Sequence, residues 1–145
     1  MTIQEWLVDY LRTAGAVAGT VHQLEGDVLR LCAASNIPEP VQAVVRWVPR
    51  GKGMAGQALE SGEPVQTCNL KDDSSGQVRP GARAVNAGAA IAIPVRDSQG
   101  AITAVVGVAF AEQREIPQAE VSRLSNETAT LISLLLPYAR YVDSQ

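Results

Sequence analysis

Residues 48–65 have the sequence VPRGKGMAGQALESGEPV, and this segment decides which fold the chain can adopt. Its closely spaced glycines permit positive φ or close backbone approach, which a sharp entry into a helix requires. Residues 54–60 favour a short helix that Gly62 ends, and residues 64–69 then predict a strand. The segment therefore predicts a tight turn, a short helix and a strand in immediate succession.

The N-terminal third adds a helix and a hairpin. Thr2 and Glu5 have the spacing of a capping box, and apolar residues then recur at three- and four-residue steps. Residues 17–24 and 28–34 are rich in β-branched and apolar residues and flank a tight turn, so they predict two paired strands. Prolines on both sides of residues 41–47 leave room there only for a helical turn or a short strand.

The C-terminal half predicts a long loop, a second hairpin and a final helix. Residues 71–88 are polar and have no period, whereas residues 89–96 and 102–111 are apolar runs on either side of a turn. The final helix is predicted from Pro117 onward, with a kink or a break at Pro137. Its apolar stripe comprises Val121, Leu124, Thr128, Leu131, Leu135, Tyr138 and Val142. Segregated hairpins with helices at both ends predict an α+β fold with an antiparallel sheet.

Three parts of the sequence resemble GAF domains. Residues 48–65 are similar to that family's central signature, in which an Ile-Pro-x-Gly-x-Gly-like segment opens a short helix that closes in a Ser/Thr-Gly-x-Pro turn. Residues 89–95 and 105–108 resemble the family's late hairpin. The resemblance implies one GAF-like domain over residues 1–145. It also implies a sheet of about six strands, with the terminal helices on one face and loops and short helices on the other.

Composition excludes several classes of function. The net charge is −3 and the basic residues are scattered, which argues against a nucleic-acid binder. The longest apolar runs, such as residues 134–137, are far shorter than the roughly 20 residues that cross a bilayer. The first twelve residues do not read as a secretion signal. We therefore expect a cytoplasmic protein without membrane or nucleic-acid partners.

The cysteines bear on whether the chain is an enzyme. Within the family resembled, the free methionine-(R)-sulfoxide reductases carry a cysteine in the Gly-x-x-Gly segment and another in the long loop. Here those places hold Ala55 and residues near Arg83. Cys68 is the thiol nearest the implied pocket, whereas Cys32 reads as a small apolar residue of a strand. The prediction is that the chain is not an enzyme, with a reductase that uses Cys68 as the alternative.

Two other features have a structural and a functional interpretation. His22 is the single histidine, and its position within a strand predicts a solvated side chain, with haem ligation as the alternative. The Gly51-Lys52-Gly53 segment predicts a tight turn, with a phosphate-binding loop as the weaker alternative because no Gly-Lys-Ser/Thr ending follows. Neither feature predicts a cofactor or a metal site.

The resemblance implies a ligand pocket between the sheet and the long loop. Arg79 and Arg83 lie in that loop, and Trp47, Cys68 and Asn69 lie on flanking segments. Charge-assisted hydrogen bonds and ring contact from these residues suit a small anionic or aromatic ligand. The alternative is that both arginines merely keep a surface loop hydrated.

The leading hypothesis is a sensory or regulatory module that binds a small metabolite and signals through its terminal helices. A separate effector protein would then be needed. The apolar stripe of the final helix has the seven-residue rhythm of a coiled-coil seam, and Ile132 and Leu136 offer a second stripe that can cover the sheet. We therefore expect a homodimer built from the first and final helices, with a monomer whose two stripes wrap a single core as the alternative. A ligand-free dimerisation module is the third reading.

Overall fold

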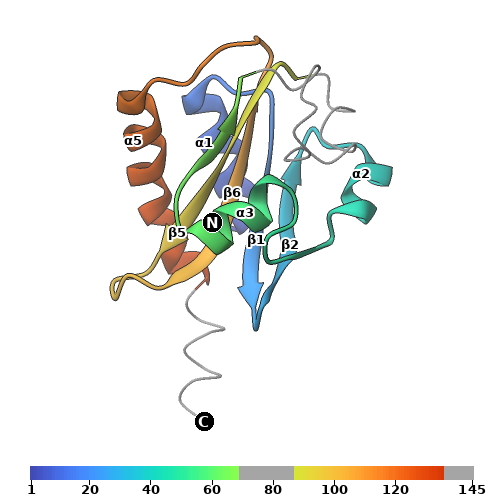
Figure 1. The fold of residues 1–145 in the computed structure, drawn as a ribbon. Coiled ribbons are helices and arrows are strands. Elements are labelled where there is room, and N and C mark those ends of the chain that lie inside the picture. The colour runs from blue at the N-terminus through green and yellow to red at the C-terminus, as the bar shows by residue number, and fades with distance from the viewer. Residues whose placement is uncertain (69–86, 136–145) are drawn as a thin grey trace.

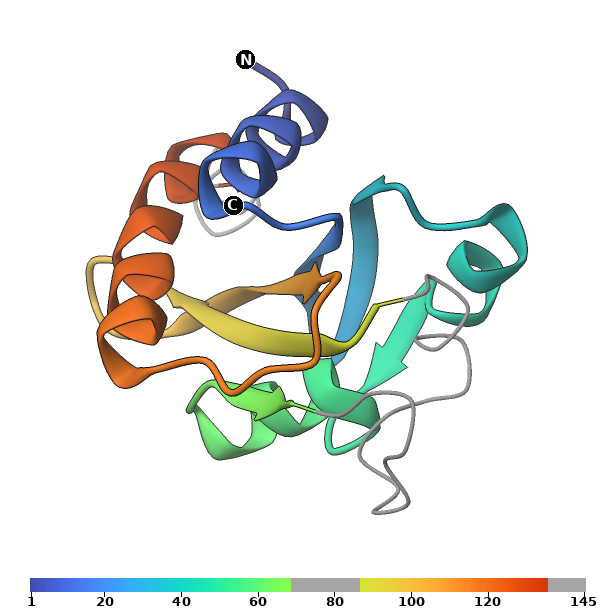
Figure 2. The same ribbon diagram turned by 90° about the horizontal axis from the view of Figure 1, so that it is seen from above.

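A computed structural model describes residues 1–68 and 87–135. A six-stranded antiparallel sheet with the strand order β3-β2-β1-β6-β5-β4 lies between two layers of helices. Helices α1 and α5 cover one face of the sheet, and the short helices α2 and α3 lie over the other face (Figures 1 and 2). This arrangement confirms the predicted α+β fold.

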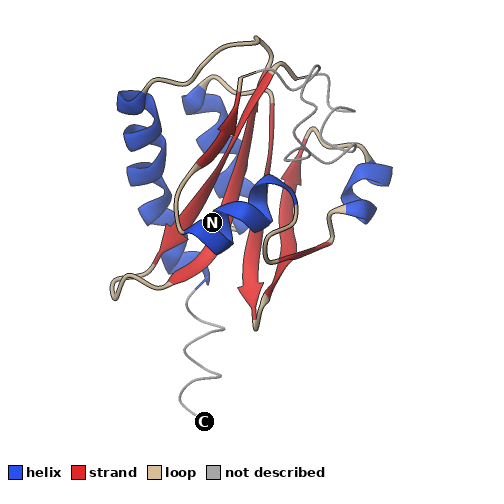
Figure 3. Cartoon of the chain, viewed as in Figure 1, coloured by secondary structure: helices blue, strands red, loops and turns tan. Residues whose placement is uncertain are grey.

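The secondary structure follows the predicted order closely (Figure 3). The strands are β1 Ala18–Glu25, β2 Val28–Ser35, β3 Trp47–Pro49, β4 Val65–Thr67, β5 Ala89–Arg96 and β6 Ile102–Phe110. The helices are α1 Ile3–Ala14, α2 Glu39–Val44, α3 Gly53–Ser61 and α5 Gln118–Glu127, with the 3-10 helix η1 at Thr128–Leu131.

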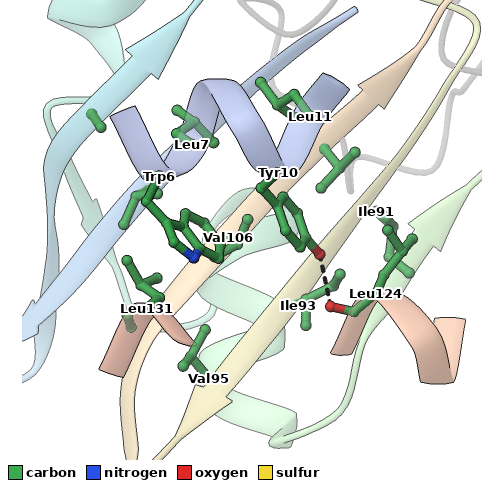
Figure 4. Close-up of a cluster of buried hydrophobic side chains, with 14 of the residues drawn as sticks. Trp6, Leu7, Tyr10, Leu11, Ile91, Ile93, Val95, Val106, Leu124 and Leu131 are labelled. Carbon is green, nitrogen blue, oxygen red and sulfur yellow. Dashed lines mark hydrogen bonds between the residues drawn. The ribbon is translucent and has the colours of Figure 1, made fainter. Parts of the chain in front are cut away.

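Helix α1 begins and ends as its sequence predicts. The Thr2 hydroxyl accepts a hydrogen bond from the Glu5 backbone N–H, and the Glu5 carboxylate accepts one from the Thr2 backbone N–H. Gly15, at φ 75°, ends the helix in the left-handed region. Tyr10 stacks on Trp6 with ring centroids 4.6 Å apart, and its hydroxyl donates to the Leu124 carbonyl at 2.8 Å (Figure 4). The aromatic pair therefore joins α1 to α5 over the sheet.

Residues 39–49, which follow the first hairpin, form two elements rather than one. Where residues 41–47 were expected to form a helical turn or a short strand, α2 occupies Glu39–Val44 and β3 follows at Trp47–Pro49. Pro38 lies at the N-cap of α2 and Pro40 in its first turn, positions where proline costs no helical hydrogen bond. The prolines therefore start this helix instead of preventing it.

The final helix begins after Pro117 as predicted, but a 3-10 turn interrupts its α-helical hydrogen bonding within the described residues. Helix α5 ends at Glu127, and the chain continues as η1. The Thr128 hydroxyl donates to the Ser125 carbonyl at 2.6 Å, and the Thr130 hydroxyl donates to the Glu127 carbonyl at 3.1 Å. Hydroxyl groups that bond back to the preceding turn bend helices, which accounts for the tightened turn. The break predicted at Pro137 lies outside the described residues.

The stripe assigned to a dimer seam packs instead on the chain's own sheet. Val121, Leu124, Leu131 and Leu135 are buried in the same cluster as Trp6 and Leu7, and Leu124 and Leu131 are fully buried. Ile132, expected to cover the sheet, is only partly buried. The most apolar face of the helix packs on the sheet, because burying that face removes the most apolar area from water. The described residues of this stripe are therefore buried within the chain and are not free to form a coiled-coil seam.

Candidate functional site

A cavity of about 150 Å³ lies between the second face of the sheet and helices α2 and α3. Strands β1, β5 and β6 form its floor. The described residues around it are Gly19, Thr20, His22, Ile37, Val41, Val45, Val48, Lys52, Gly53, Met54, Ala55, Ala90, Ile91, Ala92, Gly107, Val108 and Ala109. This lining is almost entirely apolar.

The cavity exists because the floor of the sheet is built from small side chains. Ala90 and Ala92 of β5 face it, as do Gly107 and Ala109 of β6. A Cβ atom at residue 107 would lie 2.7 Å from the Thr20 hydroxyl oxygen, so glycine is needed beside this threonine. Part of the space beneath α2 and α3 is therefore left open, next to a second buried cluster in which Ala58 and Leu59 of α3 pack with Val105 of β6.

Helix α3 is held over the cavity by a compact turn. The Gly51 N–H donates to the Gly56 carbonyl at 2.8 Å, and the Lys52 N–H donates to the Pro49 carbonyl at 3.1 Å. A Cβ atom on Gly56 would lie 2.4 Å from the Pro49 carbonyl oxygen, so the predicted close backbone approach is confirmed. Because the Gly51 and Lys52 amides are already bonded within the turn, they are not available to a phosphate group.

His22 is buried at the edge of the cavity, and its expected solvated position is wrong. Only 3% of the residue is exposed, because β1 is a central strand and the end of α2 covers this part of it. The His22 Nε2 atom lies 2.8 Å from the carbonyl oxygen of Val45. A carbonyl can only accept, so Nε2 carries a proton and donates this hydrogen bond.

The other ring nitrogen of His22 is left without a partner. Burial lowers the pKa of the imidazole, and the hydrogen bond to Val45 opposes this effect more weakly. With Nε2 protonated, the neutral ring presents Nδ1 as a bare acceptor. This atom is buried and has no hydrogen-bond partner in the part of the chain that the structure describes. An unsatisfied buried acceptor lowers the stability of the folded chain by about 1–3 kcal/mol.

The predicted ligand-binding residues are not gathered around this cavity in the described residues. Trp47 is 49% exposed on the edge strand β3, and Cys68 is exposed just after β4. Neither is among the described residues that line the cavity. Asn69, Arg79 and Arg83 lie outside the described residues, so their role stays a prediction.

Sequence reasoning missed the residues that do line the cavity. Thr20 and His22 lie two positions apart on β1 and so share one face, and Met54 and Ala55 reach the cavity from α3. One signal was present: alanine or glycine alternates with larger apolar residues along 89–96 and 102–110. Treating both segments as apolar runs overlooks this alternation.

The sheet, its two helical layers and the cavity between sheet and short helices define an α+β domain of the regulatory, sensory type. The sequence model of the GAF domain matches residues 2–136. The chain belongs to the GAF domain family. No curated protein matches the chain.

Solved structures share this fold at low sequence identity. The GAF domain of an Acinetobacter phosphoenolpyruvate-protein phosphotransferase superposes with a TM-score of 0.75 and 13% identity, covering 97% of this chain and 86% of that one. The GAF domain of a Bacillus halodurans two-component sensor histidine kinase gives 0.74 and 14%, covering 96% and 95%. A type II free methionine-R-sulfoxide reductase from Thermoplasma acidophilum gives 0.65 and 14%, covering 92% and 94%. These likenesses establish the fold alone.

Among the helices that the structure describes, none has both the length and the apolar character needed to cross a membrane.

Proposed function

We propose that the chain is a sensory or regulatory GAF domain that binds a small molecule in the cavity beneath α2 and α3. The observation that carries this proposal is the almost entirely apolar cavity between the sheet and these two helices. An apolar cavity with few polar groups is the usual form of a ligand site.

The position of the cavity supports signalling through the terminal helices. Strands β5 and β6 line the cavity with one face and carry the core under α1 and α5 with the other. The hydrogen bond from Tyr10 to the Leu124 carbonyl joins these two helices directly. A shift of either strand on ligand binding would therefore reach both helices. The proposal includes a cytoplasmic location and a separate effector protein that would respond to this change.

A thermal-shift screen of metabolites tests ligand binding. A molecule that binds only the folded state stabilises it by about 2.7 kcal/mol at a concentration of 100 Kd. We expect at least one small compound to raise the melting temperature in a concentration-dependent way. Arg83→Ala tests the predicted role of the long loop, while Gln99→Ala, in the exposed turn between β5 and β6, is the control. A broad screen without any shift would contradict the proposal.

A reductase is the second candidate, because the fold is shared with the Thermoplasma free methionine-R-sulfoxide reductase. Ala55, which takes the place of that group's first cysteine, lies on the cavity wall. A single thiolate cannot complete a disulfide cycle unaided, so we expect no turnover of free methionine sulfoxide in a coupled assay. Turnover that disappears in Cys68→Ser would reverse the order of the two candidates.

A homodimer is also part of the proposal, with its interface moved from the buried stripe to the outer surface of α1. Val8 is 44% exposed and Met1 is 72% exposed, so this surface still offers apolar contacts. Light scattering at micromolar concentration should give twice the 15.3 kDa mass of one chain. Val8→Asp should return the monomer without unfolding it, and a wild-type mass near that of one chain would contradict the dimer.

A further inference from the structure

The C-terminal helix changes its winding beside α1. Helix α5 is α-helical up to Glu127, η1 follows at Thr128–Leu131, and residues 132–135 are again α-helical. A 3-10 turn is common at the end of a helix, whereas a 3-10 stretch inside a helix often marks a functional hinge or a strained sequence. The position of η1 between two α-helical stretches therefore calls for a local cause.

The spacing of the buried residues does not require the 3-10 winding. Five residues of this region are buried and follow one another at three- and four-residue steps: Val121, Leu124, Thr128, Leu131 and Leu135. This spacing is the period of an α-helix, so a continuous α-helix would also turn all of them towards the sheet. Both windings are therefore compatible with the same buried stripe.

Hydroxyl groups favour the 3-10 winding. The Ser125 carbonyl accepts from the backbone N–H of Thr128 and also from its hydroxyl, at 2.6 Å. In an α-helix this carbonyl would pair with the N–H of Ala129. The Thr130 hydroxyl donates in the same way to the carbonyl three residues back, that of Glu127, at 3.1 Å. Hydroxyl groups that bond back to the preceding turn disturb α-helical winding, so these two hold η1 in the tighter form.

The surroundings of η1 leave it room to rewind. The Trp6 indole N–H of α1 donates to the Thr130 hydroxyl at 2.8 Å, and a groove of about 460 Å³ between α1 and the C-terminal helix is lined by both residues and by Leu134. A second groove, of about 330 Å³, lies between Thr128 and Gly62 at the end of α3. Close packing on all sides would hold one winding, whereas open grooves permit two.

A change of winding in η1 would rotate the helix that follows it. A 3-10 helix advances by about 120° and 2.0 Å per residue, and an α-helix by about 100° and 1.5 Å. Rewinding Thr128–Leu131 as α-helix therefore turns residues 132–135 by about 80° relative to α5 and shortens the helix by about 2 Å. We propose that η1 is a two-state hinge whose exchange between 3-10 and α winding rotates residues 132–135. Its use as a signal rests on the proposed function, in which the terminal helices report an event at the cavity.

A matched pair of substitutions at Thr128 tests the hinge. Thr128→Val keeps the shape of the side chain and removes the hydroxyl, whereas Thr128→Ser keeps the hydroxyl. NMR couplings across hydrogen bonds identify the carbonyl that pairs with the Ile132 N–H, which is that of Ala129 in the 3-10 winding and that of Thr128 in an α-helix. We expect the α pattern in Thr128→Val and the 3-10 pattern in Thr128→Ser. The same pattern in both variants would overturn the role given to the hydroxyl.

Rewinding should also move two partly buried side chains in opposite directions. The change from 3-10 to α winding turns the residues after η1 backwards around the helix axis, which brings Ile132 towards the sheet and turns Leu134 away from it. A soluble paramagnetic probe should therefore broaden the Leu134 methyl signals more, and the Ile132 methyl signals less, in Thr128→Val than in the wild-type protein. Thr128→Ser should match the wild type. Loosened packing alone would expose both side chains.

The wild-type protein gives the deciding measurement. A hinge exchanges between two states, so NMR relaxation dispersion should detect a minor state at residues 128–135 whose chemical shifts match those of Thr128→Val. An unchanged 3-10 pattern in Thr128→Val, or a wild-type protein without this exchange, overturns the hinge and leaves ligand binding in place. All of these measurements use the protein without a ligand. A metabolite screen without any thermal shift would therefore remove the proposed use of the hinge and leave the hinge itself standing.

Discussion

The two faces of the sheet are built from the same strands and perform different tasks. Towards α1 and α5, β5 and β6 present large side chains that are fully or almost fully buried: Ile91, Ile93, Val95, Val106 and Val108 (Figure 4). Towards α2 and α3 the same strands present Ala90, Ala92, Gly107 and Ala109 around the cavity, and Val105 in a second buried cluster beside it. Because adjacent residues of a strand point to opposite faces, one alternating sequence gives a filled core and a hollow site.

The contrast shows how a small domain can keep a site without losing its stability. The core face supplies the buried apolar area that offsets chain entropy. The cavity face gives up part of that area and leaves the His22 Nδ1 atom unpaired. Substitutions on the two faces should therefore have different effects.

The largest effect is expected on the core face. Leu124 is fully buried between α5 and the sheet, so Leu124→Ala should lower the free energy of unfolding by about 2–5 kcal/mol. Urea denaturation followed by circular dichroism measures this loss. Gln99→Ala, in the exposed turn between β5 and β6, should change stability by less than about 0.5 kcal/mol. A loss below about 1 kcal/mol for Leu124→Ala would mean that this face is not the core.

A pair of identical substitutions compares the faces directly. Ala104 is fully buried on the core face, so Ala104→Leu should overpack it and cost about 1–3 kcal/mol. Ala90 lines the cavity, where Ala90→Leu finds space and should cost less than about 1 kcal/mol. Denaturation curves give both values. Equal costs at the two positions would argue that no usable space exists beneath α2 and α3.

A smaller effect should follow from the burial of His22. Burial lowers the pKa of its imidazole in the folded protein below the ordinary 6.5, so the unfolded chain takes up a proton first as pH falls. The contribution of His22 to stability is thus present above pH 6.5 and is lost as the pH falls from 7 to 5.5. His22→Leu should be flat over this window in urea denaturation. The same slope in both proteins would show that His22 is not its source.

The architecture could be predicted because it depends on local patterns. The capping box at Thr2, the glycines of residues 48–65 and the two apolar hairpins fixed the order and type of the elements. The packing of the final helix could not be predicted from local patterns. Its stripe suits a coiled coil as well as a sheet, and only the proximity of β5 and β6 decides that Leu131 and Leu135 pack inward.

The site was harder to predict because its residues are distant in sequence. Burial of His22 depends on α2, whose Val45 carbonyl lies 23 residues further along the chain. A strand histidine looks solvated until that cover is known. The alternation of small and large residues in β5 and β6 is visible in the sequence. It indicates a cavity only once it is known that the small residues lie on the face covered by α2 and α3.

Xenon binding followed by methyl NMR tests the central claim most directly, because xenon enters apolar cavities of this size without needing a specific polar group. The cavity predicts concentration-dependent shifts at the methyl groups of Met54, Ala90 and Ala92, with Ile93 and Val106 on the core face unaffected. Shifts that were absent at all these methyls, or equal on the two faces, would contradict the division of the sheet into a filled core and a hollow site.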